Sequence, residues 1–387
     1  MHQEFPLIHR PKLLTIDSAH WANLIKDATS TSSAMRDKAA AFPASLLDRG
    51  YVLTLTFHHL EELLSHQRDE VVAARLEYLA NLSSIAWLKS QRPPHGLGGI
   101  TDILAAEAVV QCEGATDLLS VRDAAMQRLI RFGSATDALG DLDVWWVLRP
   151  LFRARNASVQ TVAAIAPVDF GFGSTLIGDL IKMRFRVPED TSEVIGIMTQ
   201  NLRREIAVKG DARIRNPNEV AEKFFDQVKA TVPSGEGDIW DFVVRTAEAR
   251  GVSRDEIRLD MTSNELGDLC TFRQQLHVVA DATGLDLYRL RASVKMQLCP
   301  HWVLHQASSR HRQVELRRPG SDVNDAYLAA LGPYVGRLYV DKRKAENLRR
   351  VLSKTPELAG LMGEISKAAH YWEIPTQLDD TAEQRSA

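Results

Sequence analysis

Acidic residues follow two short apolar segments that lie at opposite ends of the sequence. Asp17 follows Lys12–Ile16, and Asp341 follows Arg337–Val340. If both segments are strands of an open parallel α/β sheet, their carboxyl ends share one edge, where ligands bind. Carboxylates gathered at such an edge repel one another unless a cation lies between them, and their oxygens suit Mg²⁺ or Mn²⁺. Asp17 and Asp341 are therefore candidate ligands of a divalent metal.

Two pairs of acidic residues lie at the starts of expected helices. Glu61 and Glu62 follow a strand expected at 51–57, and Asp322 and Asp325 begin a helical segment. Each acid also has a structural interpretation, because Asp is a frequent helix cap and adjacent Glu residues often form a solvated helix face. Taken one at a time, these acids fit the structural interpretation better than the catalytic one.

The elements expected to position these acids are α/β in character and lie at the two ends of the chain. Near the N-terminus we predict strands at 12–16 and 51–57, two helices after residue 57, and a short apolar segment at 85–88. Near the C-terminus we predict a strand at 337–340. A last helix is expected to open at Thr355 and Pro356 and to carry the apolar residues Leu358, Leu361, Met362 and Ile365.

The middle of the chain has a different character. A segment rich in Pro and Gly at 91–99 breaks the pattern, and from there to about residue 307 the periodicity is almost entirely helical. Thr101 and Thr116 are expected to cap two of these helices, the second of which ends at Gly133. Thr262 and Glu265 have the spacing of a capping box and predict another helix start.

Composition limits the class of protein. The chain has 387 residues, 45% hydrophobic and 25% charged, which is typical of globular proteins. Its net charge of −3 means that any nucleic-acid surface depends on local clusters of Lys and Arg. No run of 18 apolar residues predicts a membrane span, and three widely spaced cysteines suit a reducing compartment. We therefore expect a soluble, cytoplasmic protein that does not contact membranes.

Basic residues flank the acids near the C-terminus. Arg310 and Arg312 precede Asp322, while Lys342 and Arg343 directly follow Asp341. Cations on both sides of an acidic site are what a phosphate backbone needs, so these four residues are candidates for substrate binding. A solvated helix face explains any one of the clusters equally well.

Three segments resemble the PIN-domain family of nucleases. KLLTIDSAHW resembles the opening strand of these domains, with Asp17 as the first acidic ligand and Ser18 as the hydroxyl beside it. VLTLTFHHLEELL resembles their second strand and helix, in which a Glu before Leu is the second ligand; Glu62 matches best and Glu61 next. SDVNDAYLAALGPYVGRLYVDKR resembles the closing segment and implies the remaining ligands, which are Asp325 and Asp341, with Asp322 as an alternate to Asp325.

The resemblance implies a fold and its division into domains. It covers roughly residues 10–90 and 318–352, and more than 200 residues separate the second and third acids, which lie much closer together in most PIN domains. We therefore expect a PIN-like three-layer α/β domain with a parallel sheet, interrupted by a large all-α inserted domain. The expected boundaries are 1–98 and 308–373 for the PIN-like domain, 99–307 for the insertion, and 374–387 for a flexible tail.

The resemblance also implies a function. It points to a hydrolase that cleaves phosphodiester bonds with Mg²⁺ or Mn²⁺, and to an endoribonuclease in particular, with RNA favoured over DNA. The helical insertion is open to three roles, which are substrate selection, binding of a regulatory protein and formation of homo-oligomers. A non-catalytic PIN-like protein that binds nucleic acid or other proteins is the main alternative. A phosphatase acting on a small phosphoester is a third.

Overall fold

The computed structural model describes residues 11–92, 96–165, 172–183, 189–210, 214–231, 237–311 and 326–379. Its internal contacts divide the chain into two compact units. Unit 1 comprises residues 1–156, 297–313 and 324–387, and unit 2 comprises residues 157–296 and 314–323. The fold is mixed α/β, with a mostly parallel sheet in unit 1, so the predicted α/β class is confirmed at this level.

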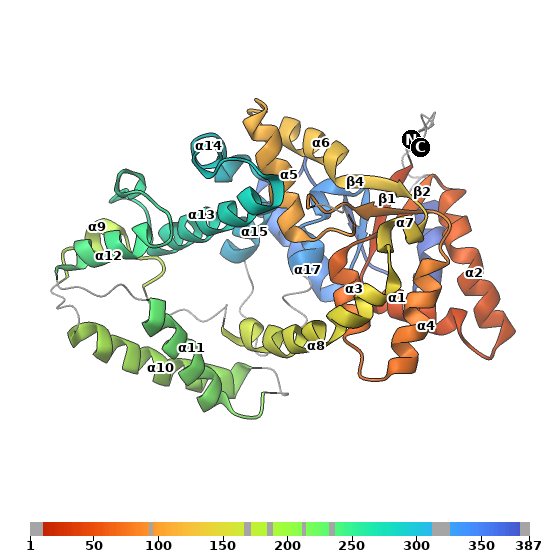
Figure 1. The fold of residues 1–387 in the computed structure, drawn as a ribbon, viewed down its shortest axis with the longest axis horizontal. Coiled ribbons are helices and arrows are strands. Elements are labelled where there is room, and N and C mark those ends of the chain that lie inside the picture. The colour runs from red at the N-terminus through yellow and green to blue at the C-terminus, as the bar shows by residue number, and fades with distance from the viewer. Residues whose placement is uncertain are drawn as a thin grey trace. The chain divides into compact units, whose positions relative to one another are not determined.

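A six-stranded sheet forms the centre of unit 1 (Figure 1). Its strands are β1 (Lys12–Ile16), β2 (Tyr51–Leu55), β3 (Ile85–Leu88), β4 (Ile130–Gly133), β5 (Arg337–Tyr339) and β6 (Glu364–Ser366). Their order across the sheet is β4-β3-β2-β1-β5-β6, and every neighbouring pair is parallel except β3 and β4. The chain thus builds one half of the sheet from β1 to β3 and returns to the other side of β1 with β5 and β6.

The sheet carries a hydrophobic core on each face, because successive strand residues point to opposite sides. Leu14 and Ile16 of β1 belong to one core, and Leu13 belongs to the other. The first core contains α1 (Ser18–Ala28), α2 (Ser33–Leu47), α3 (Phe57–Leu64), α4 (Asp69–Ala80) and α7 (Ala135–Leu139). The second contains α5 (Ile100–Cys112), α6 (Leu118–Leu129), α15 (Pro300–Arg310) and α17 (Lys342–Lys354). Strands buried on both faces explain the unbroken apolar runs of the sequence.

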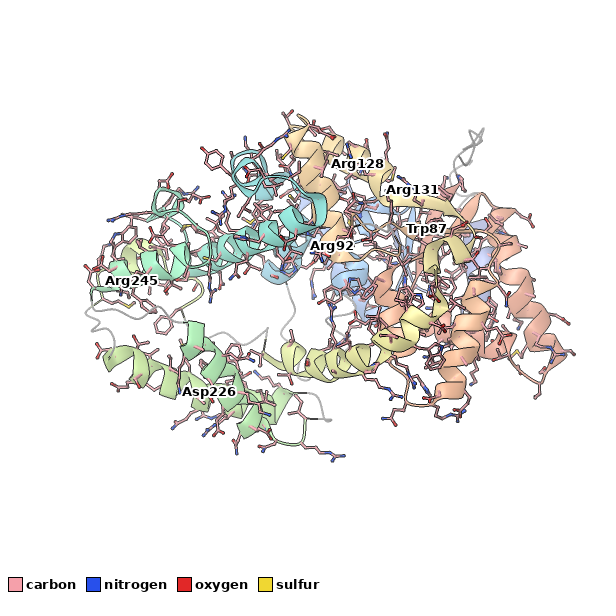
Figure 2. The ribbon with its side chains drawn as sticks, viewed as in Figure 1. Trp87, Arg92, Arg128, Arg131, Asp226 and Arg245 are labelled. Atoms are coloured by element: carbon pink, nitrogen blue, oxygen red, sulfur yellow. The ribbon has the colours of Figure 1, made fainter. Side chains whose placement is uncertain are left out.

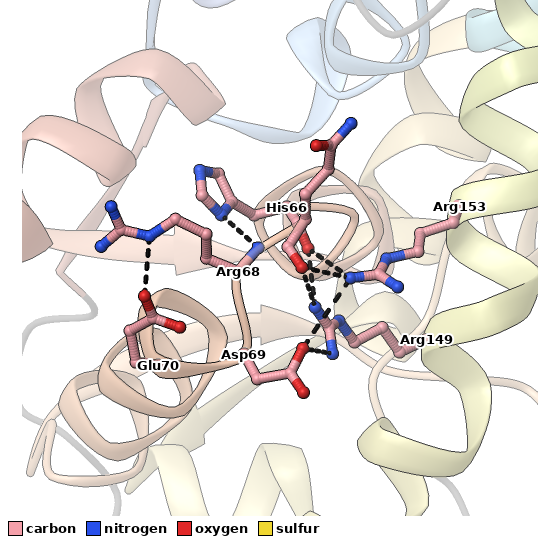
Figure 3. A network of polar contacts seen from close by, with 7 residues as sticks. His66, Arg68, Asp69, Glu70, Arg149 and Arg153 are labelled. Carbon is pink, nitrogen blue, oxygen red and sulfur yellow. Dashed lines mark hydrogen bonds and ion pairs between the residues drawn. The ribbon is translucent and has the colours of Figure 1, made fainter.

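Two arginines fix the start of α8 (Leu142–Ile165) on the loop between α3 and α4 (Figure 3). Arg149 is buried; it lies 2.5 Å from Asp69 Oδ1 and donates to the carbonyl oxygens of His66 and Gln67 at 2.9 and 3.1 Å. Arg153 donates to the same two carbonyls. These hydrogen bonds hold the first half of α8, which belongs to unit 1, against the loop.

A buried carboxylate holds the helix by which the chain returns to unit 1. Glu107 of α5 has no solvent exposure, and it accepts from the backbone N–H of His301 at 3.1 Å and pairs with His301 Nδ1 at 2.6 Å. The hydroxyl of Tyr334 also donates to it. Burial and the charge of Glu107 raise the pKa of Tyr334 well above its ordinary value, so this hydroxyl remains a donor.

Unit 2 is helical in the parts that the structure describes. Its helices are α9 (Ile177–Leu180), α10 (Glu189–Lys209), α11 (Pro217–Thr231), α12 (Ile239–Glu248), α13 (Ser263–Thr283) and α14 (Leu287–Ser293). One core gathers Ile177, Val244 and Leu266 with their neighbours, and another joins α10 to α11 through residues such as Leu202 and Phe225. None of the described helices of the chain is long and apolar enough to cross a membrane.

Four expectations about single elements are wrong. Gly99, and not Thr101, caps α5, and Asp117, and not Thr116, caps α6 by accepting from two backbone N–H groups. Helix α6 ends at Leu129, and not at Gly133 as expected, because residues 130–133 form strand β4. The last helix is absent: a 3₁₀ turn at Pro356–Leu358 precedes strand β6.

Unit 1 extends beyond the ranges that we predicted for the PIN-like domain. It runs without interruption to Asn156, past the expected boundary at 98, and includes α5, α6 and β4. At the other end, Ile374 and Leu378 are buried in the first core, within the range that we expected to be a flexible tail.

Candidate functional site

The point at which the strand order reverses lies between β1 and β5. In an open parallel sheet, ligands bind outside the carboxyl ends of the strands at such a point. Ile16 pairs with Tyr339 in the register of the two strands, and the backbone N–H of Asp17 donates to the carbonyl of Tyr339 at 3.1 Å. Asp17 and Asp341 therefore follow adjacent strands, which lie about 5 Å apart in a sheet.

Asp17 is held by the helix that follows it. Its Oδ1 accepts from the backbone N–H of His20 at 2.8 Å and lies 2.6 Å from His20 Nδ1. The other ring nitrogen of His20 lies 3.2 Å from the carbonyl oxygen of Ala368, so both nitrogens face acceptors. Burial lowers the pKa of His20, but the hydrogen bond and charge of Asp17, with smaller contributions from Ala368 and Glu373, outweigh it and raise that pKa above its ordinary value.

Asp341 is exposed and caps α17. Its Oδ1 accepts from the backbone N–H of Lys344 at 2.8 Å. Within the described residues, the second carboxylate oxygen of Asp17 and that of Asp341 accept no hydrogen bond. Each acid thus serves its own helix with one oxygen and leaves the other available to a ligand.

The two glutamates of α3 lie in different environments. Glu61 is buried: Arg155 Nε is 2.9 Å from its Oε1, and His58 Nδ1 is 3.3 Å from its Oε2. The backbone N–H of Ile100 donates to His58 Nε2, so the ring proton is on Nδ1 and points to Glu61. Glu62 is half-buried, and within the described part of the chain its carboxylate forms no hydrogen bond or ion pair, while its backbone carbonyl accepts from Ser65. Glu61 is therefore already paired with Arg155, whereas the carboxylate of Glu62 is available to a metal ion.

A stacked ring pair extends the Glu61 cluster. Tyr327 stacks on His58 with ring centroids 4.3 Å apart, and the guanidinium of Arg155 lies 5.7 Å from the Tyr327 centroid. Glu61, His58, Arg155 and Tyr327 therefore form one compact group beside the start of α5.

His59 links the ends of two strands. Its Nε2 lies 3.0 Å from the carbonyl oxygen of Ile16, and its Nδ1 accepts from the backbone N–H of Thr56 at 3.1 Å. The proton therefore resides on Nε2, and the ring is neutral. Burial is the main reason that the pKa of His59 falls to about 4. The residue fixes the end of β1, directly before Asp17, to the start of α3.

The remaining predicted residues are placed as follows. Ser18 is half-buried at the first position of α1, Lys342 and Arg343 begin α17, and Arg310 is exposed at the end of α15. Arg312, Asp322 and Asp325 lie outside the described residues. In the described part of the chain, no three His, Cys, Asp or Glu side chains form a group that could hold a metal ion. Asp17, Glu62 and Asp341 are therefore not gathered by themselves.

Basic residues also lie at the β3–β4 side of the sheet. Lys89 follows β3 directly and is half-buried, and Arg131 lies in β4 beside Arg128 of α6 (Figure 2). Burial and the charges of Arg131 and Arg128 lower the pKa of Lys89 below its ordinary value. Arg128 is paired with Glu113, so Lys89 and Arg131 carry the positive charge at this end of the sheet.

The sequence prediction missed the histidines that contact the acids. His20 lies three residues after Asp17, and His58 lies three residues before Glu61. This spacing brings side chains together on a helix, so an acid and a histidine three apart at a helix start was a usable signal.

Comparisons of the chain with protein-family models, with curated proteins and with solved structures found no match.

Proposed function

We propose that unit 1 is a PIN-like, metal-dependent nuclease whose active edge lies at the carboxyl ends of β1 and β5. The proposal is carried by one observation: Asp17 and Asp341, from opposite ends of the sequence, follow adjacent parallel strands where the strand order reverses. The resemblance to PIN domains assigns metal-binding roles to the same two residues.

The donors present fit a hard divalent cation. Asp17 and Asp341 each offer one carboxylate oxygen that accepts no hydrogen bond among the described residues. Oxygen ligands of this kind suit Mg²⁺ or Mn²⁺, and Glu62 and Asp325 are the further ligands that the resemblance implies. A bound ion would polarise the scissile phosphate and lower the pKa of the attacking water.

The chain's own residues orient the acids and hold the substrate. His20 fixes the rotamer of Asp17, and the N-terminus of α17 fixes Asp341. Lys342 and Arg343 follow Asp341 in the first turn of that helix and lie next to the edge, where they suit the phosphate backbone of RNA. Arg310 and Arg312 are the further basic residues that we assign to substrate binding.

A non-catalytic protein that binds RNA is the second candidate, and one observation favours it. Asp17 is paired with a histidine of raised pKa, and both Asp17 and Asp341 already cap helices, which is a sufficient structural reason for their presence. On this alternative the protein binds RNA without cutting it and takes up no metal.

The test is cleavage of labelled single-stranded RNA and DNA by the purified chain with Mn²⁺. We expect the wild type to cut RNA, and Asp17→Asn and Asp341→Asn each to reduce the rate at least about 100-fold, because a bound metal contributes several kcal/mol. Asn is as good a helix cap as Asp, so both variants keep their helix starts, and Asp17→Asn loses in addition the charge pair with His20. Circular dichroism of both variants checks that they are folded. Asp117→Asn, which changes a cap elsewhere in unit 1, is the matched control and should cut like the wild type.

Two results together would favour the binding-only alternative. These are the absence of cleavage of either substrate, and the absence of heat from Mn²⁺ binding in calorimetry. Cleavage that persists in EDTA or in both Asn variants would contradict the metal site itself.

A further inference from the structure

We propose that His370 and Trp372, on the segment that follows β6, form a nucleobase-stacking platform, which makes a single-stranded nucleic acid the substrate of the proposed active edge. The inference rests on the proposed function and names the substrate class of the same site. The two rings stack with centroids 4.2 Å apart and an interplanar angle of 11°. His370 is exposed and Trp372 is half-buried, so the pair ends in an imidazole that is open to solvent.

The backbone that carries the platform is fixed. Tyr371, which separates His370 and Trp372 in the sequence, is 1% exposed. Its ring packs edge-on against Phe42 with centroids 5.1 Å apart. Its hydroxyl lies 3.0 Å from Asp27 Oδ2. The backbone N–H groups of Ala369 and His370 donate to Glu373 Oε2 at 3.0 and 3.4 Å. A ring pair held in this way loses little conformational entropy when it binds a planar ligand.

The segment that carries the platform begins next to the proposed active edge. It follows β6, which is parallel to β5, and the backbone N–H of Val340 donates to the carbonyl of Ser366 at 3.2 Å. The carbonyl oxygen of Ala368, two residues before His370, contacts the ring of His20 that pairs with Asp17. One histidine therefore connects the platform segment to the first proposed metal ligand.

The surrounding charges suit a nucleotide. Lys38 Nζ lies 4.5 Å from the centroid of Trp372, and both Lys38 and Lys367 are exposed. Aromatic rings stack on any base, and nearby cations attract the phosphates on either side of it. Bases inside a duplex are already stacked and paired, so only an unpaired base can reach an imidazole on the protein surface.

The test measures binding in EDTA, where no metal-dependent hydrolysis occurs. Fluorescence anisotropy would compare a labelled eight-nucleotide RNA with the same backbone carrying abasic sites. We expect the wild type to bind the RNA with bases about tenfold more tightly or better. His370→Ala should weaken that complex by about 5- to 100-fold and leave abasic binding unchanged, whereas His370→Phe should retain the preference.

Tyr288→Ala, which removes an aromatic side chain that is 81% exposed on α14 of unit 2, is the matched control and should bind like the wild type. Equal affinity of the wild type for both oligonucleotides, or wild-type binding by His370→Ala, would overturn the platform and leave the rings to another partner, such as a protein. If the protein prefers the RNA with bases in EDTA but never cuts RNA with Mn²⁺, the platform is supported and the nuclease proposal is contradicted. If it cuts RNA but shows no preference for bases, the nuclease proposal is supported and the platform is contradicted.

Discussion

His59 and His20 show how two buried histidines near the same edge respond to pH in opposite directions. The pKa of His59 is lowered by burial, so this residue favours the fold when it is neutral. The pKa of His20 is raised by Asp17, so this residue favours the fold when it is charged. The contribution of His20 is present below its unfolded pKa and is lost as the pH rises through its folded pKa.

The low pKa of His59 predicts sensitivity to acid. The unfolded chain takes up this proton near pH 6.5, whereas the folded chain does so only near pH 4. The contribution is therefore complete above pH 6.5, and about 3 kcal/mol of it is lost by pH 4. Urea unfolding of the wild type and of His59→Gln at pH 7 and pH 4 measures this loss.

Other groups titrate over the same pH range, so the contribution of His59 is obtained by comparing the wild type with His59→Gln. His59→Gln is less stable at pH 7, because it loses the ring that joins Thr56 to Ile16. Its further loss between pH 7 and pH 4 should be about 3 kcal/mol smaller than that of the wild type. If both proteins lose the same free energy of unfolding between pH 7 and pH 4, the pKa of His59 is not lowered in the folded state.

At the scale of elements, the buried carboxylate of Glu107 fixes α15 to α5. Tyr334→Phe removes one donor from this carboxylate without changing the shape of the core. A hydrogen bond to a charged group contributes about 1.5–3 kcal/mol, and we expect the free energy of unfolding to fall by that amount.

Urea unfolding followed by fluorescence measures the free energy of unfolding of the wild type and of Tyr334→Phe. Tyr288→Phe, on an exposed tyrosine, should change stability by less than about 0.5 kcal/mol, and an equal effect of both variants would exclude this role.

The elements that the sequence predicted well are those that local pattern specifies. β1 has the predicted bounds, and β5 ends one residue before the predicted end of its segment. The capping box of Thr262 and Glu265 opens α13 as expected, with the side chain of Thr262 accepting from Glu265 N–H. In each case a run of apolar residues meets a polar residue that satisfies the next backbone group, and both signals lie within a few residues.

The elements that were missed depend on distant partners. Leu358, Leu361, Met362 and Ile365 have helical spacing, yet Ile365 lies in β6, where it pairs with Leu338 of β5. Gly363 N–H donates to the carbonyl of Gly332, which ends any helix at that point. β4 is four residues long and pairs with β3, more than 40 residues earlier in the chain. Neither pairing is visible in the local sequence.

The residues of the candidate site were likewise predictable only where the signal is local in the sequence. Asp17 and Asp341 could be found as acids at strand ends, and the structure places their strands side by side. Only the resemblance ranked Glu62 above Glu61, because the physical difference between them depends on Arg155 in α8. His370 and Trp372 gave no signal, since β6 itself was not predicted.

At the scale of the whole molecule, each unit has hydrophobic cores of its own. Leu14 belongs to a core of unit 1, and Leu266 belongs to a core of unit 2. We therefore expect two separable transitions in differential scanning calorimetry of the full chain. Leu14→Ala should lower one melting temperature and Leu266→Ala the other, each by a loss of roughly 2–5 kcal/mol in its own unit. A single transition that both variants shift equally would contradict independent cores.

The pairing of β1 with β5 also has a consequence for the newly made chain. Ile16 and its partner Tyr339 are separated by about 320 residues of sequence. At a synthesis rate of roughly 5–20 residues per second, one edge of the central strand waits about 15–65 s before its partner leaves the ribosome. During that time the strand presents unpaired N–H and C=O groups beside apolar residues, which is the usual starting point for wrong pairing between nascent chains. The strand that ends directly before Asp17 is thus made long before the partner strand that completes its pairing.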